Sequence, residues 1–328
     1  MVQPEVLKKW DLGIGEASGF QVSDIHAYSI TNFALFKFSD GRYVLFSAPG
    51  YKWQETVKQQ VIGEGHSVLY FHTNDSAKVE GYLKFTQKPV VDTSLAPASR
   101  VLSLTDVASE FTRVLYESEM TSEKMVIATE ISNQMVKCVQ EDITCVAAIG
   151  KLANHHGYTY YHSARVAAYS IALAIEMGES DSLCLETIAI GCLLHDIGKS
   201  KIDLEILNKK SALTAVEWNL MRGHPEMGGD VVAGSNLDNS ALEIILHHHE
   251  RLDGEGYPHK LNSGEISKEV RIASFADTFD ALTTNRPYQP SCTRFEALDV
   301  IRHRFLNQLD KGCFKAMISI MQKATKTA

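Results

Sequence analysis

Two short segments, about fifty residues apart, concentrate residue types that bind metal ions. The first is Leu194-His195-Asp196-Ile197-Gly198-Lys199, and the second is His247-His248-His249-Glu250, which continues into Asp253-Gly254-Glu255-Gly256-Tyr257-Pro258. Imidazole and carboxylate without thiolate suit Fe, Mn, Ni or Zn better than Mg or Ca. The Gly-rich turn ending in Tyr-Pro lies beside the histidines. Together these segments predict a metal cluster with a substrate loop next to it.

The His195-Asp196 pair comes at the end of an apolar segment. The run from Leu185 to Leu194 is nearly all apolar, which is typical of a buried helix, and Gly198 supplies a stop signal. A carboxylate at such a buried end needs a partner, because an unpaired one is very costly. A hydrogen-bonded His-Asp pair in the core and a metal-binding pair both meet this need.

The run of three histidines favours the metal reading. Adjacent side chains on a helix point about 100° apart, so His248 and His249 can converge on one ion or an ion pair. His247 lies about 200° from His249 and is expected to face elsewhere, as a surrounding or surface residue. Three more residues, each more often structural when taken alone, complete a mixed nitrogen and oxygen set: His162, His224 and Asp277.

The elements that carry these residues are helical. Beyond residue 100 the apolar positions recur at helix-like intervals, from Met125 to Ile149 and onward. Helices are predicted over 163–177, 183–197, 214–222, 240–250, 268–284, 293–305 and 312–323. Residues 101–328 are therefore expected to form an all-α bundle domain.

The first part of the chain has a different periodicity. Residues 33–46 form two β-prone runs around Asp40-Gly41, which predicts a hairpin. A helix is expected to follow, with Trp53, Val57 and Val61 on one face, and then a second hairpin over 68–71 and 79–85. Residues 1–88 are interpreted as a small α+β domain with a regulatory, sensory or docking role, and 89–100 as a linker.

Composition sets the outer limits. The chain has 328 residues, 45% of them hydrophobic and 22% charged, which is typical of a globular protein and long enough for two domains. Its net charge of -8 argues against binding a nucleic-acid polymer. No run is long and apolar enough to span a membrane, and the start does not resemble a signal peptide. Six cysteines without CxxC spacing are expected to be buried free thiols, which favours a cytoplasmic location.

The order of these residues resembles a known family. His162, His195-Asp196, His224, His248-His249 and Asp277 follow the ligand order of the HD superfamily of metal-dependent phosphohydrolases. The Gly256-Tyr257-Pro258 loop is that of its HD-GYP subgroup, and the likeness extends over residues 120 to 310. It implies a helical HD-type bundle that hydrolyses cyclic di-GMP to linear pGpG, in some members through to GMP. The family's loop also contacts diguanylate-cyclase (GGDEF) domains.

The resemblance also implies roles for single residues. Two divalent transition-metal ions, Fe first and then Mn, Ni or Zn, would be bridged by Asp196 and by a hydroxide that attacks the phosphate. One ion would be held by His162, His195 and Asp277, and the other by His224, His248 and His249. Lys199 would neutralise phosphate charge or assist the leaving oxygen, and Arg286 would bind the other phosphate. Gly256 and Tyr257 would approach the substrate closely.

The chain departs from the family pattern at two informative positions. Where members with a third metal carry an acidic residue, this chain has Tyr158, so a binuclear site is expected; His155 and His156 do not match the spacing. A basic residue common in the family is replaced by Gln289, which predicts weaker phosphate binding. Hydrolysis of another cyclic dinucleotide, or a weakly active binding module, are therefore the alternatives. A homodimer is left open.

Overall fold

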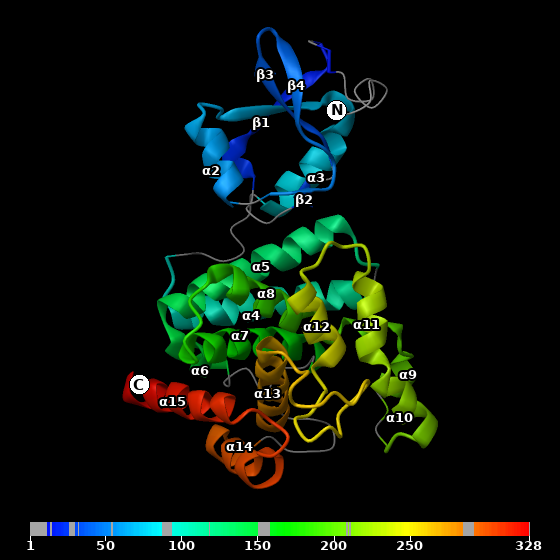
Figure 1. Ribbon diagram of the computed structural model, residues 1–328, viewed down its shortest axis with the longest axis vertical. Coiled ribbons are helices and arrows are strands. Elements are labelled where there is room, and N and C mark those ends of the chain that lie inside the picture. Colours follow the sequence, from blue (N-terminus) through cyan, green and yellow to red (C-terminus); the bar gives the residue numbers. More distant parts are fainter. Residues whose placement is uncertain are drawn as a thin grey trace. The chain divides into compact units, whose positions relative to one another are not determined.

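The computed structural model is shown in Figure 1. It describes residues 12–13, 15–25, 30–31, 33–53, 55–86, 94–117, 119–149, 158–207, 209, 211–284 and 292–327. Two compact units make up the chain. The first comprises residues 1–89 and 121–130, and the second comprises 90–120 and 131–328.

The first unit is built on an antiparallel sheet with the strand order β1-β6-β3-β4. Its strands are β1 (Ala17–Gln21), β3 (Leu35–Ser39), β4 (Arg42–Ser47) and β6 (Val68–His72), and β2 (Ile30–Thr31) pairs separately with β5 (Tyr51–Lys52). The predicted hairpin over 33–46 is confirmed. Its turn residues Asp40 and Gly41 have φ of 53° and 74°, which is the backbone of a turn that matches the twist of the strands.

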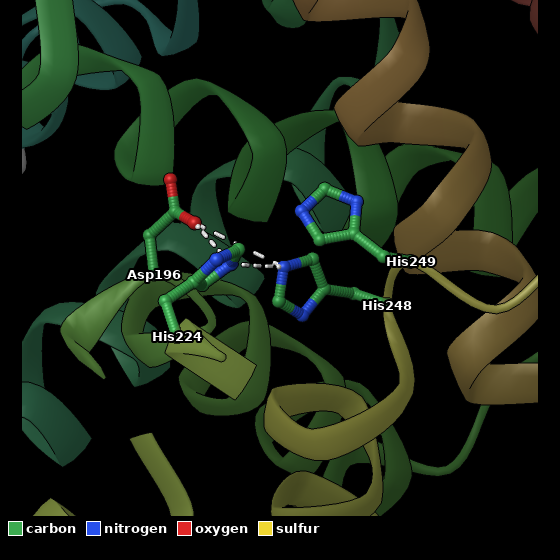
Figure 2. Close-up of side chains that lie close together, drawn as sticks. All are labelled: Asp196, His224, His248 and His249. Carbon is green, nitrogen blue, oxygen red and sulfur yellow. Dashed lines mark hydrogen bonds and ion pairs between the residues drawn. The ribbon is translucent and has the colours of Figure 1, made fainter. Parts of the chain in front are cut away.

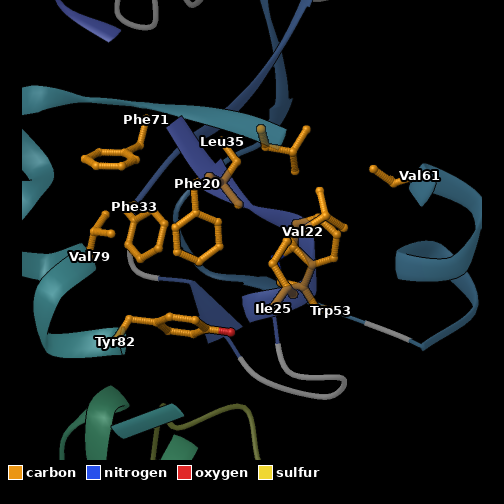
Figure 3. Close-up of a cluster of buried hydrophobic side chains, with 11 residues drawn as sticks. Phe20, Val22, Ile25, Phe33, Leu35, Trp53, Val61, Phe71, Val79 and Tyr82 are labelled. Carbon is orange, nitrogen blue, oxygen red and sulfur yellow. The ribbon is translucent and has the colours of Figure 1, made fainter. Parts of the chain in front are cut away.

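Helices α2 (Glu55–Gly63) and α3 (Ser76–Thr86) and the short 3-10 helices η2 (Val22–Asp24) and η3 (Thr73–Asp75) also belong to this unit. Its main core gathers Phe20, Phe33 and Tyr82 with their aromatic and aliphatic neighbours (Figure 3). The predicted helix after the first hairpin is present, although Trp53 precedes it. The predicted second hairpin is wrong, because residues 79–85 lie within α3. Val79 and Tyr82 are three residues apart, and both are buried on one helical face.

The rest of the described chain is helical. Its elements are α4 (Pro97–Glu117), α5 (Ser122–Glu141), η4 (Ile143–Cys145), α6 (Val146–Ile149), α7 (Tyr158–Glu176), α8 (Ser182–Leu194), η6 (Ile197–Lys201), α9 (Leu204–Leu207), α10 (Ala215–Arg222), α11 (His224–Val232), α12 (Asn239–His247), α13 (Lys268–Thr283), α14 (Arg294–Val300), the π-helix η7 (Ile301–Phe305) and α15 (Lys311–Thr327). The fold class expected from the sequence is therefore confirmed: a small sheet-containing region followed by an all-α domain.

Helix α8 is the buried centre of the second unit, as its apolar sequence predicts. Leu185, Ile188 and Leu194 are each no more than 1% exposed, and α8 packs against α7, α12 and α13. Gly191 permits the contact with α12, because a Cβ there would lie 2.9 Å from the Ile244 side chain.

Several predicted boundaries differ from the structure. Helix α11 was not expected, and α4 begins at Pro97, inside the predicted linker. Helix α12 ends at His247, so His248 caps the helix and His249 lies in the following turn. All six cysteines are free, as expected, but Cys184 and Cys292 are only half-buried. Among the described residues, no helix is long and apolar enough to cross a membrane.

Candidate metal centre

Seven side chains named from the sequence lie together in the second unit as two adjoining groups. Asp196, His224, His248 and His249 form one group, shown in Figure 2, and His162, His195 and Asp277 form the other. In each group every residue offers one nitrogen or oxygen atom within 4.8 Å of the others. The donors come from α7, the α8–η6 junction, α11, the end of α12 and α13.

Asp196 stands between the two groups. Its Oδ1 lies 3.2 Å from His224 Nε2 and 3.9 Å from His248 Nε2. Its Oδ2 lies 3.5 Å from His195 Nε2 and 3.8 Å from His162 Nε2. One carboxylate oxygen therefore faces each group, which is the arrangement that a bridging ligand needs. The hydroxyl of Tyr116 donates to the backbone oxygen of Asp196 at 2.9 Å and holds this turn.

The backbone fixes which nitrogen of three histidines carries hydrogen. Nδ1 of His195 lies 2.6 Å from the Cys192 carbonyl, and Nδ1 of His224 lies 2.7 Å from the Met221 carbonyl. Nδ1 of His248 lies 3.0 Å from the Ile245 carbonyl. A carbonyl only accepts, so each Nδ1 must donate, and each neutral ring then presents an Nε2 lone pair.

These lone pairs converge without donors between them. His224 Nε2 and His248 Nε2 are 3.1 Å apart, although neither carries hydrogen in the neutral rings. Among the described residues, His195 Nε2 and Asp196 Oδ1 are buried without a hydrogen-bond partner. Buried acceptors that face one another repel unless a cation lies between them. The donor set therefore fits divalent cations bound through nitrogen and oxygen.

His162 is oriented by a carboxylate behind it. Its Nδ1 lies 2.7 Å from Asp280 Oδ2, while its Nε2 lies 3.0 Å from Asp277 Oδ1. Arg165 holds Asp280 through two bonds, from Nε at 2.6 Å and from Nη2 at 3.1 Å. Both side chains behind the ligand, Asp280 and Arg165, are buried. Such carboxylate–histidine pairs fix ring orientation in metal sites.

Burial and charge shape the protonation of the cluster. Burial is the largest influence on the Asp196 carboxyl and raises its pKa, but Lys199 and then His195 lower that pKa well below its usual range. Burial lowers the pKa of His249 to about 3 and that of His248 well below its usual value. Burial also lowers the pKa of His162, but the hydrogen bonds to Asp277 and Asp280 raise it above normal overall.

The Gly-Tyr-Pro loop packs onto the cluster. The Tyr257 ring stacks on the His249 ring, with centroids 4.7 Å apart and planes 29° apart. Gly256 is required for packing, because a Cβ there would lie 2.5 Å from the Glu250 Cα and the Arg251 nitrogen. The buried Glu250 carboxylate accepts from the His259 and Leu261 backbone amides and so ties the loop to the end of the histidine run.

The other residues named from the sequence fall into three cases. Lys199 lies at the site, with Nζ 2.6 Å from Asp196 Oδ2. His247 turns away, as expected, and its ring lies 5.2 Å from that of His259. Arg286, Gln289, His155 and His156 lie outside the described residues, and Tyr158 is the first residue of α7.

Sequence reasoning assigned no role to several residues that hold the ligands. Asp280 and Glu250 stood within the motifs, and their acidic character in a buried segment was the available signal. Arg165 and Tyr116 gave no such signal, because their roles depend on partners 115 and 80 residues away in the chain.

Comparisons with known proteins show the family of the chain. A model of the HD domain family matches residues 148–312, and the chain belongs to that family. The resemblance to its HD-GYP members is confirmed by the relatives. Cyclic di-GMP phosphodiesterase PA4108 of Pseudomonas aeruginosa is 36% identical over 172 residues, which cover 52% of this chain and 41% of that protein. A 3'3'-cGAMP-specific phosphodiesterase 3 of Vibrio cholerae is 35% identical over 175 residues, covering 52% and 37%.

The fold has a solved counterpart. Bd1817, an HDG"Y"P protein from Bdellovibrio bacteriovorus, aligns with a TM-score of 0.61 at 18% identity and covers 94% of this chain and 100% of that one. This likeness shows the fold alone. The chain spans about two fifths of the length of the curated relatives it matches.

Proposed function

We propose that the chain is a metal-dependent phosphodiesterase that hydrolyses cyclic di-GMP to linear pGpG. The observation that carries the proposal is Asp196, whose two oxygens face two groups of buried donors. Three histidine rings, each fixed by a carbonyl at its Nδ1, present Nε2 lone pairs: those of His195, His224 and His248. These lone pairs support two cation sites rather than a hydrogen-bonded core. The names of the curated relatives support the substrate.

The donor set suits two divalent transition-metal ions. His162, His195 and Asp277 would hold one ion, and His224, His248 and His249 would hold the other, with Asp196 shared. Nitrogen and oxygen donors without thiolate favour Fe, and then Mn, Ni or Zn. When bound, such ions would supply Lewis acidity to the phosphoryl oxygens and would bring the pKa of water close to neutrality, which would supply the hydroxide that hydrolysis needs.

The chain's own residues orient and neutralise the substrate. Lys199 is 21% exposed, and its ammonium group lies at the Asp196 oxygen that faces His162 and His195. From there it neutralises charge on the phosphate that is cleaved. Tyr257 stacks on His249, which keeps that imidazole in place.

Wider expectations from the sequence stay predictions. They include a regulatory, sensory or docking domain over residues 1–88, a linker over 89–100, contacts with diguanylate-cyclase domains through the Gly-Tyr-Pro loop, and a homodimer. A phosphate contact by Arg286 belongs with them.

The test is a product assay on the whole chain loaded with Fe(II) or Mn(II) under anaerobic conditions. Cyclic di-GMP is added and the products are separated by chromatography. We expect linear pGpG, and we expect Asp196→Ala to lose activity and both ions. Binding of cyclic di-GMP without any product would reject the enzyme and support a binding module.

A second substrate is favoured by the relatives named for 3'3'-cGAMP. The same assay run with 3'3'-cGAMP decides between them. Faster turnover of 3'3'-cGAMP than of cyclic di-GMP would move the assignment to that nucleotide while keeping the phosphodiesterase.

A further inference from the structure

A guanidinium group stands at the outer edge of the candidate metal centre. Arg222 is the last residue of α10, two residues before the candidate ligand His224. Its Cζ lies 4.9 Å from the centroid of the Tyr257 ring, and that ring stacks on His249. The Tyr257 ring therefore contacts both the Arg222 guanidinium and the candidate ligand His249.

Among the described residues, Arg222 differs from neighbouring cations because it is not paired with a carboxylate. Lys199 is paired with Asp196, Arg165 with Asp280 and Lys209 with Glu217. Within the described parts of the chain, Arg222 has the Tyr257 ring as its partner and no carboxylate within ion-pair distance. Its side chain is exposed. A guanidinium stacked on a ring keeps its N–H groups free at the edge.

The surroundings of Arg222 suit a purine base better than a phosphate. Phosphates are expected at the cluster and at Lys199, whereas Arg222 lies farther out, against the Tyr257 ring. In a nucleotide the base is separated from its phosphate by a ribose, so a base would lie at such a distance from the cluster. Trp218, one turn earlier on α10, is 49% exposed and offers an aromatic face of the kind on which bases stack. Guanine presents O6 and N7, two acceptors that match the arginine fork, while adenine has a donor in place of O6.

We propose that Arg222 binds the O6 and N7 edge of a guanine base and makes the site selective for guanine over adenine. The inference rests on the proposed function, because it assigns the base to a nucleotide whose phosphate lies at the cluster. Tyr257 then has two contacts: it stacks on His249 and holds the guanidinium of Arg222 in position.

The first test measures binding without catalysis. Calorimetric titration of the whole chain with GMP and with AMP is compared between the wild type and Arg222→Gln. We expect the variant to bind GMP about ten- to a hundredfold more weakly, as for loss of one bidentate arginine–guanine contact. AMP binding should change less than about twofold, because adenine makes no such contact. Equal loss for both nucleotides, or loss for neither, would overturn the assignment.

The second test separates this inference from the proposed function. Initial rates are measured with cyclic di-GMP, 3'3'-cGAMP and cyclic di-AMP for the wild type, Arg222→Gln and the control Arg302→Gln. Arg302 is an exposed arginine of η7, so its variant matches the change in charge. We expect Arg222→Gln to raise KM for cyclic di-GMP most and for cyclic di-AMP least.

The outcomes of the rate test are distinct. If the wild type cleaves cyclic di-GMP and Arg222→Gln weakens all three substrates equally, Arg222 is a phosphate contact and the inference falls alone. If the wild type cleaves none of the three, the proposed function falls. The titrations with GMP and AMP still decide the role of Arg222 in that case.

Discussion

At the scale of single residues, side chains behind the ligands decide where the ligand atoms point. Asp280 offers no atom to either donor group, yet it accepts a hydrogen bond from His162 Nδ1 and two from Arg165. It thereby turns His162 Nε2 toward Asp277 and Asp196. Burial raises the pKa of Asp280, but Arg165 and His162 lower that pKa by more than burial raises it, so the carboxyl is ionised.

Asp280→Asn should therefore weaken metal binding while every proposed ligand remains. We expect a loss of about ten- to a hundredfold in metal affinity, as for other residues behind metal-bound histidines. Removing the carboxylate charge beside the buried Arg165 should also lower the free energy of unfolding by about 3 kcal/mol or more. Metal titration and urea denaturation measure the two effects. Asp299→Asn, at an exposed aspartate, is the control; equal metal affinity in both variants would contradict the orienting role.

The sequence identified residues whose spacing is characteristic and missed those whose role depends on distant partners. His195-Asp196 and His248-His249 stand out because adjacent polar residues follow apolar helices. Arg165 is an ordinary helical arginine until α13 brings Asp280 to it. His248 and His249 lie close together, as expected, but helical spacing explains this only in part, since α12 ends at His247 and the following turn directs His249.

At the scale of elements, the contact between η6 and α11 sets the distance from Asp196 to His224. Gly198 allows it, because a Cβ there would lie 1.9 Å from the His224 carbonyl oxygen and 2.4 Å from the Gly228 nitrogen. These are backbone atoms, so the two elements would have to separate. Gly198 is therefore required for packing, whereas the predicted role in ending α8 is wrong, because α8 already ends at Leu194 and Gly198 lies within η6.

Gly198→Ala should push the two elements apart and disrupt both donor groups. We expect a loss of unfolding free energy of at least about 1–3 kcal/mol, the range for overpacking, together with lost metal binding. Gly264→Ala is the matched control, because a Cβ at Gly264 meets open space. Chemical denaturation and elemental analysis would test this. Full metal content in Gly198→Ala would show that the close approach is not needed.

Helix α15 is tied to the end of α7 by one carboxylate. Glu176 accepts from Lys323 at 2.6 Å and from Ser319 at 2.7 Å. Burial raises the pKa of Glu176, but these hydrogen bonds lower it below its usual value overall. A lowered folded pKa means that the stabilisation is fully present above the unfolded pKa of about 4.3 and is lost as pH falls through the folded value.

Glu176→Gln should therefore destabilise the protein at pH 7 and have less effect in acid. Because Lys323 is 50% exposed, the difference at pH 7 should be about 1 kcal/mol or less. Urea denaturation of metal-free protein at pH 7 and at pH 3.5 measures it, with Lys323→Gln as the partner variant. A difference that is as large at pH 3.5 as at pH 7 would rule out this titration.

Two elements show why local sequence could not predict the whole fold. Residues 79–85 carry β-prone side chains, but the core of the first unit takes Val79 and Tyr82 on one face of α3. Pro225, Gly228 and Gly229 look like turn residues, yet they lie in α11. Proline is tolerated in the first turn, and the glycines let α11 approach Ile245 and Leu246 closely.

At the scale of the whole molecule, the candidate centre joins elements from α7 at residue 158 to α13 at residue 283. Five separate segments bring hydrogen-bond acceptors to one place. The repulsion among these lone pairs and carboxylates lowers the stability of the second unit. Bound cations would remove that penalty. Metal binding and stability of this unit should therefore be linked.

Chelation should lower the melting temperature of the second unit. A ligand at a hundred times its Kd stabilises by about 2.7 kcal/mol per site, which corresponds to about 5–10 °C for a unit of this size. Calorimetry of metal-loaded protein, with and without EDTA, measures the shift. Asp196→Ala should abolish it, because both donor groups share that carboxylate. Elemental analysis should give two ions per chain, since Tyr158 supplies no carboxylate for a third. Three ions per chain would contradict the prediction that Tyr158 limits the site to two. A melting-temperature shift that remains in Asp196→Ala would contradict the proposal that Asp196 is shared by both ions.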